Sequence, residues 1–156
     1  MQQRSFGDGP PVSLFTLGTM RALQAPDQML MVLRAAHAAG VNHLETAPAY
    51  GPAESFLGEA LTQLHSEGIQ PAGHGWVVTS KLLPGLSLDE GRAALRGSLE
   101  RLGIERLDNL AIHGLNLDSH LNWALHGEGA RLIDWALNSG TAVSYTHLRA
   151  HETEEN

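Results

Sequence analysis

The chain has 156 residues, 42% of them hydrophobic, so it is long enough to bury the core of one ordinary domain. Its 17 acidic and 10 basic residues give a formal net charge of -7, which argues against a nucleic-acid or anionic-membrane partner. The absence of cysteine excludes disulfides, zinc–thiolate sites and cysteine-ligated iron–sulfur clusters within these residues. No apolar run approaches the roughly 18 residues of a membrane helix, and we expect a cytoplasmic protein.

The N-terminal part of the chain predicts one strand and one helix. A polar start with a turn at 7–10 precedes the apolar run 12–17, which predicts a strand that stops at Gly18. Pro26 then opens a helix whose apolar residues recur at helical spacing. Gly40 stands where a left-handed C-terminal cap is expected.

The same alternation continues through the middle of the chain. Residues 41–46 predict a second strand, and residues from about 54 to 64 predict a second helix with an apolar face. Residues 76–80 are rich in β-forming side chains and predict a third strand. A Pro-Gly pair at 84–85 breaks the chain after it.

A third helix and a fourth strand follow. Ser87 and Glu90 have the spacing of a capping box, which predicts a helix that begins here and stops at Gly103. Residues 107–112 predict a strand, and residues 119–138 predict a helical region with a glycine-rich interruption. Four strand–helix units therefore follow one another along the chain.

Alternating strands and helices imply a parallel sheet with right-handed crossovers. Periodicity alone leaves two α/β architectures open, a doubly wound sheet and a barrel. In both of them chemistry gathers at the C-terminal ends of the strands. The residues at these ends are therefore the candidates for a functional site.

Four chemically useful side chains stand at these strand ends. Glu45 and Tyr50 follow the second strand, Lys81 the third and His113 the fourth. Each alone has a simpler structural role, but together they predict proton donation to a carbonyl as hydride arrives from a cofactor. A phenol becomes a better acid beside an ammonium, His113 would orient the carbonyl, and Glu45 would hold the lysine in place.

The sequence supports two other kinds of site less well. Lys81 as the Schiff-base lysine of a barrel aldolase is an alternative, although the nearby Tyr50 and His113 favour a reductase. The remaining histidines lack the close, same-face spacing that metal ligation needs, so no metal site is predicted.

Three of these segments together resemble the aldo/keto reductases. Residues 38–51 with the following 54–61 are similar to that family's second-strand signature, 78–81 to its lysine strand and 108–113 to its histidine strand. The resemblance covers roughly the first 140 residues. It implies an α/β fold of the TIM type, a (β/α)8 barrel with about four βα units present, that binds NADP(H) and reduces an aldehyde or ketone.

The resemblance also implies roles for individual residues. Tyr50 inherits the proton donor, Lys81 the partner that lowers its pKa, and His113 the substrate-orienting role. Glu45 stands where the family usually carries aspartate. The loop of Gly18, Thr19 and Met20 resembles the one that approaches the nicotinamide ribose.

Four βα units are half of what a TIM-type barrel needs. We therefore expect residues 1–140 to be the N-terminal half of such a barrel and to be inactive alone. Residues 141–156 resemble a translated sequencing adapter, so a non-native tail is expected where a fifth strand should begin. The alternative function is an NADP(H)-binding regulatory or sensor subunit with little turnover, which the Glu45 departure would favour. The substrate and the oligomeric state are left open.

Overall fold

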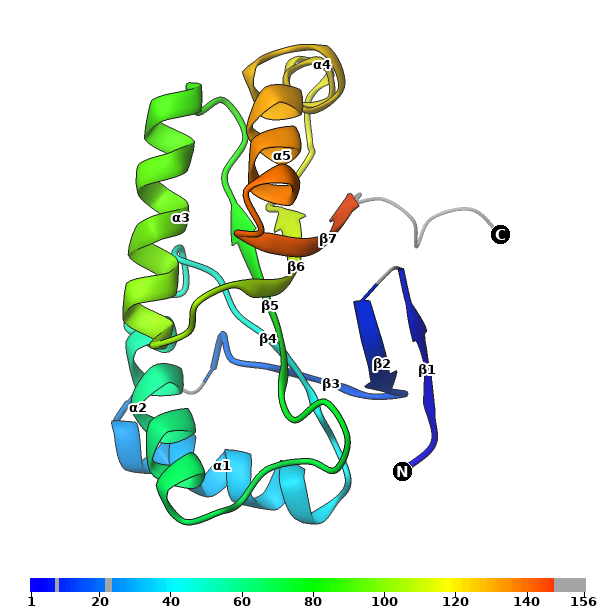
Figure 1. Cartoon of the computed structure of the whole chain (residues 1–156). Helices are drawn as coiled ribbons and strands as arrows, with labels where there is room; N and C mark the ends of the chain where they lie inside the picture. The colour runs from blue at the N-terminus through cyan, green and yellow to red at the C-terminus, as the bar shows by residue number, and fades with distance from the viewer. Residues whose placement is uncertain (8, 22–23, 148–156) are drawn as a thin grey trace.

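The computed structural model describes residues 1–7, 9–21 and 24–147. An antiparallel hairpin precedes a five-stranded parallel sheet of order β3-β4-β5-β6-β7 (Figure 1). The strands are β1 (Gln3–Phe6), β2 (Gly9–Ser13), β3 (Thr16–Gly18), β4 (His43–Glu45), β5 (Val77–Leu82), β6 (Leu107–Ile112) and β7 (Ala142–His147). The helices are α1 (Pro26–Ala38), α2 (Ala53–Ser66), α3 (Leu88–Leu102), α4 (Asp118–His126) and α5 (Glu128–Asn138). None of these helices is long and apolar enough to cross a membrane.

Helix boundaries follow the local signals in the sequence. Helix α1 begins at Pro26, and Gly40 just beyond its end has a φ of 79°. Helix α3 begins with a complete capping box between Ser87 and Glu90 and ends at Gly103, whose φ is 66°. A left-handed residue after a helix is strained for any side chain with a Cβ, which explains glycine at both positions. The predicted caps of these helices are confirmed.

The predicted single strand over 12–17 is wrong, because the chain changes partners inside it. Residues up to Ser13 belong to β2 of the hairpin, whereas β3 starts at Thr16 and pairs with β4. The Ser13 backbone N–H donates to Asn42 Oδ1 (2.6 Å), and its hydroxyl donates to the carbonyl of Phe15 (2.6 Å). These bonds turn the chain from the hairpin into the parallel sheet.

The expectation that no fifth strand follows residue 140 is also wrong. Strand β7 pairs in parallel with β6, from Leu107 opposite Ala142 to Ile112 opposite His147. Val143, Tyr145 and their neighbours have high β-propensity, and β6 offers them an unpaired edge. Residues 148–156 of the predicted tail lie outside the described residues. The non-native origin of 141–156 stays a prediction.

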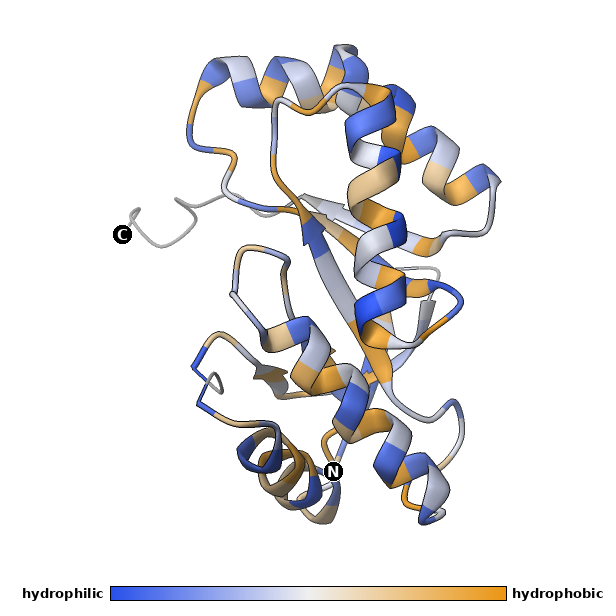
Figure 2. Cartoon of the chain, turned by 90° about the vertical axis from the view of Figure 1, so that its left-hand side faces the viewer, coloured by the Kyte–Doolittle hydropathy of each residue, from blue (hydrophilic) through white to orange (hydrophobic). Residues whose placement is uncertain are grey.

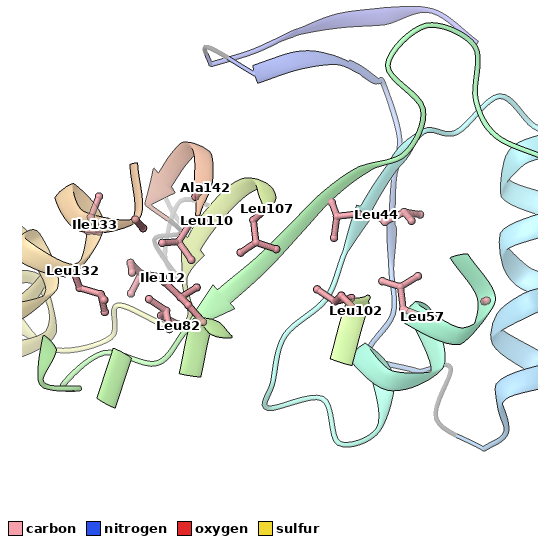
Figure 3. Packing of buried hydrophobic residues seen from close by; sticks show 14 of the residues in the cluster. Leu44, Leu57, Leu82, Leu102, Leu107, Leu110, Ile112, Leu132, Ile133 and Ala142 are labelled. Atoms are coloured by element: carbon pink, nitrogen blue, oxygen red, sulfur yellow. The ribbon is translucent and has the colours of Figure 1, made fainter. Parts of the chain in front are cut away.

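The helices cover one face of the parallel sheet and bury an apolar layer against it (Figure 1). Each helix carries both hydrophilic and hydrophobic residues, as amphipathic helices do (Figure 2). Leu82, Ile112 and Leu132 lie together in one part of this layer, and Leu57 and Leu102 in another (Figure 3). All five are almost fully buried.

The other face of the sheet carries a hydrogen-bonded polar row. His43 on β4 is 5% exposed and bonds Thr16 Oγ1 on β3 and Thr79 Oγ1 on β5, both at 2.8 Å. Asn109 on β6 reaches the same threonine at 3.5 Å and accepts from Ser144 on β7 at 3.1 Å. Because strand side chains alternate between faces, this row continues toward the strand ends that carry the candidate site.

The buried His43 predicts a specific acid sensitivity. Burial lowers the pKa of His43 in the folded state to about 4. Below pH 6.5, therefore, His43 binds a proton in the unfolded chain while it stays neutral in the folded chain. Between pH 7 and pH 5 the chain should lose about 2 kcal/mol of stability from this residue. Urea denaturation at both pH values should show a smaller loss for His43→Gln than for the unsubstituted chain. The exposed His126→Gln is the control, and an equal loss in all three chains would refute the assignment.

Candidate active site

Parallel strands bring the predicted residues to one edge of the sheet. Glu45 is the last residue of β4, Lys81 lies near the end of β5, and His113 directly follows β6. Tyr50 lies in the loop between β4 and α2, where its N–H donates to the carbonyl of Ala47 (3.0 Å). The structure therefore brings all four side chains together.

Lys81 is the centre of this cluster. Its side chain is 4% exposed, and its ammonium contacts the Glu45 carboxylate as a salt bridge. It also donates to the Tyr50 hydroxyl (2.8 Å) and to the carbonyl of Thr46 (3.2 Å). Three acceptors thus match the three N–H groups of the ammonium. Burial lowers the pKa of Lys81 to about 8, while these acceptors favour the charged form.

Tyr50 shares one carboxylate oxygen with the lysine. Its hydroxyl donates to Glu45 Oε1 (3.3 Å), the same atom that contacts the Lys81 ammonium. Burial raises the pKa of the Tyr50 phenol, so the net shift is opposite to the predicted lowering. The Lys81 ammonium lies 2.8 Å from the phenol oxygen, so its role in stabilising the phenolate stays a prediction beside this effect of burial.

His113 completes the cluster from β6. Its ring packs edge-on against the Tyr50 ring, with 5.5 Å between centroids and an interplanar angle of 83°. Burial, and then the charge of Lys81, lower the pKa of His113, which favours a neutral imidazole. Its Nδ1 is buried and has no hydrogen-bond partner within the described chain.

The rim beside Glu45 contains the three residues predicted to approach a cofactor. Gly18 is paired with Glu45 across β3 and β4, and the N–H of Thr19 donates to the Glu45 carbonyl (3.0 Å). Met20 is 46% exposed. The hydroxyls of Thr19 and Thr46 are buried and lack a hydrogen-bond partner among the described residues. Thr46 was missed from the sequence, where only its position next to Glu45 could have indicated it.

Two other observations separate this site from alternatives. Within the described parts of the chain, no group of three or more His, Cys, Asp or Glu side chains is placed to hold a metal ion. A cavity of about 380 Å³ opens where α2 and α3 pass Trp76 and Val78, and none of the four clustered residues lines it. The cavity and the four-residue cluster are therefore separate features of the fold.

Comparison with known proteins assigns this arrangement to a family. The model of the aldo/keto reductase family matches residues 14–137. The chain belongs to the aldo/keto reductase family. A relative from Mycolicibacterium vanbaalenii, named aldo-keto reductase, is 30% identical over 125 residues, which are 80% of this chain and 38% of the relative.

Solved structures show the same fold. A candidate aldo-keto reductase from Pseudomonas aeruginosa matches with a TM-score of 0.78 and 24% identity, over 93% of this chain and 58% of the other. The holo form of an aldo-keto reductase from Bacillus halodurans matches with a TM-score of 0.77 and 20% identity, over 96% and 51%. The chain thus spans about half the length of these structures. Its five parallel strands and covering helices are part of a TIM-type (β/α)8 barrel, as predicted.

The single lysine of the sequence makes the centre of the site directly measurable. In a chain labelled with 13C-lysine, the Lys81 side chain should give one signal that titrates near pH 8, well below an ordinary lysine. Glu45→Gln should lower this midpoint further, by about one pH unit or more, because the ammonium loses its anionic partner. A midpoint near 10.4 in both chains would show that the buried cluster does not form.

Proposed function

We propose that the whole protein reduces an aldehyde or ketone with NADPH, and that Tyr50 donates the proton. One observation carries the proposal: a phenol, an ammonium and a carboxylate are in mutual contact at the strand ends, with a neutral imidazole beside them. The family membership supports the same reaction class. Since the chain spans about half of its relatives, the activity belongs to a complete barrel.

Each side chain has a distinct part in this reaction. The Tyr50 hydroxyl would donate its proton to the carbonyl oxygen and become a phenolate. The Lys81 ammonium, which already lies 2.8 Å from the Tyr50 phenol oxygen, would stabilise the negative charge of the phenolate. Glu45 would keep the ammonium in place. His113, whose ring packs against the Tyr50 ring, would orient the carbonyl beside the phenol.

The residues at the rim fit a nicotinamide cofactor, which supplies the hydride when bound. The buried hydroxyls of Thr19 and Thr46 offer polar atoms that are unused within the described chain. Gly18 borders the Glu45 carboxylate, where an added Cβ would lie 3.4 Å from Oε2, at ordinary contact distance. We assign NADP(H) by resemblance to the family.

We also propose a cytoplasmic location, because the absence of cysteine fits a reducing compartment.

The geometry disfavours an aldolase-type lysine. A Schiff-base nucleophile needs a free amine, but all three N–H groups of Lys81 have acceptors and the side chain is buried. The regulatory alternative rests on Glu45 alone. Its carboxylate contacts Lys81, which is the part that the reductase proposal gives it.

Substitution of Tyr50 tests the reaction in a completed barrel. Residues 1–140 can replace the equivalent half of the Pseudomonas aeruginosa relative, and aldehyde-dependent NADPH oxidation can be followed on a carbonyl panel. Tyr50→Phe should lower kcat by about a hundredfold or more, because the proton donor is lost. NADPH binding, measured by fluorescence, should stay unchanged. Full activity in this variant would reject Tyr50 as donor, whereas NADPH binding without turnover in the unsubstituted chimaera would favour the sensor function.

The same chimaera should show a characteristic pH profile. As the pH rises through about 8, Lys81 loses the proton that stabilises the phenolate, so kcat should fall about tenfold per pH unit above this value. Glu45→Gln should move the decline to lower pH, since it weakens the ammonium form. A flat profile from pH 7 to pH 10 would contradict the role of Lys81.

A further inference from the structure

A buried carboxylate, paired with an arginine whose side chain is 40% exposed, lies behind the candidate active site on the helix-covered face of the sheet. Glu54, in the first turn of α2, has a side chain that is 1% exposed. Its Oε1 accepts from the hydroxyl of Ser80 on β5 (2.6 Å), and its Oε2 accepts from Arg101 Nε on α3 (2.9 Å). The second guanidinium nitrogen lies 2.7 Å from the same oxygen. One carboxylate therefore joins a strand and two helices.

The Glu54 network is connected through the backbone to both residues of the Lys81–Tyr50 contact. Ser80 directly precedes Lys81, and strand alternation sends its side chain toward α2 while Lys81 faces the site. Glu54 lies four residues after Tyr50, and the N–H of Ala53 donates to the Tyr50 carbonyl (3.2 Å). A shift of Glu54 relative to Ser80 would therefore change the distance between phenol and ammonium.

Helix packing alone does not explain a carboxylate at this position. Helices α2 and α3 already approach closely at Gly58, where an added Cβ would lie 2.2 Å from the carbonyl of Arg101. Burying a charge is costly, and an apolar residue of similar volume packs a core at least as well. What the carboxylate adds is direction, because its two oxygens accept only from donors at fixed positions on β5 and α3.

We propose that Glu54 is a positioning residue that, through Ser80 and Arg101, holds α2 against β5 so that Tyr50 stays in contact with Lys81. The contact itself is an observation. Only its use in proton donation rests on the proposed function. A merely structural Glu54 would affect stability and leave the coupling between phenol and ammonium unchanged.

The test measures that coupling in the full 156-residue chain, without turnover. Because Lys81 is the only lysine, its 13C signal reports its own titration. Tyr50→Phe removes one acceptor and should increase the acid ionisation constant of Lys81 about threefold or more. In the Glu54→Gln background, Tyr50→Phe should change the acid ionisation constant of Lys81 less than twofold, because the phenol and the ammonium are no longer held together.

The control is a carboxylate-to-amide change at the other end of the same helix. Glu67 follows α2 and accepts from Arg34 Nη2 (2.5 Å), far along the helix from Tyr50. Glu67→Gln should leave the Tyr50–Lys81 coupling at its original size. Equal coupling in Glu54→Gln and Glu67→Gln would overturn the proposal, whatever happens to the melting temperature.

A second variant covers the case in which Glu54→Gln does not fold. Ser80→Ala keeps the Glu54–Arg101 pair and removes only the bond to β5. It should reduce the coupling while circular dichroism stays native. Coupling retained in Ser80→Ala, or absent from the unsubstituted chain, would also reject the proposal. Intact coupling together with a completed barrel that reduces no carbonyl would reject the proposed function alone.

Discussion

The buried ammonium of Lys81 is the constraint on which the rest of the site depends. A charge removed from water must be matched by partners, and here they come from three places: the last residue of β4, the carbonyl that follows it and the loop tyrosine. These partners are near one another only because β4 and β5 are parallel, with Glu45 opposite Thr79. Lys81, two residues beyond that pair, then reaches across the end of β4.

Strand alternation separates the tasks of the two faces of the sheet. On β5, Val78, Ser80 and Leu82 face the helices, while Thr79 and Lys81 face the polar row and the site. All six residues of this strand are buried, so both of its faces are covered. Apolar burial on one face provides stability. Hydrogen-bonded polar groups on the other face provide a fixed framework beneath the chemistry.

Much of this arrangement could be predicted because its signals are local. The capping box of α3, the β-forming run of β6 and the polar residues at strand ends all lie within a few neighbours of one another. Non-local features could not be found this way. Strand β7 needs the edge of β6, and the break near Phe15 needs Asn42, which is 29 residues from Ser13. The Glu54 network joins residues 26 and 47 positions apart.

The glutamate at position 45 illustrates how a departure from a family pattern can be accommodated. Where the family usually carries aspartate, the longer side chain keeps its contact with Lys81 and also accepts from the Tyr50 hydroxyl. Gly18 on the adjacent strand borders this carboxylate without crowding it, since even an added Cβ would lie 3.4 Å from Oε2, an ordinary contact distance. The longer side chain is therefore accommodated by the two groups that it contacts, the ammonium of Lys81 and the hydroxyl of Tyr50.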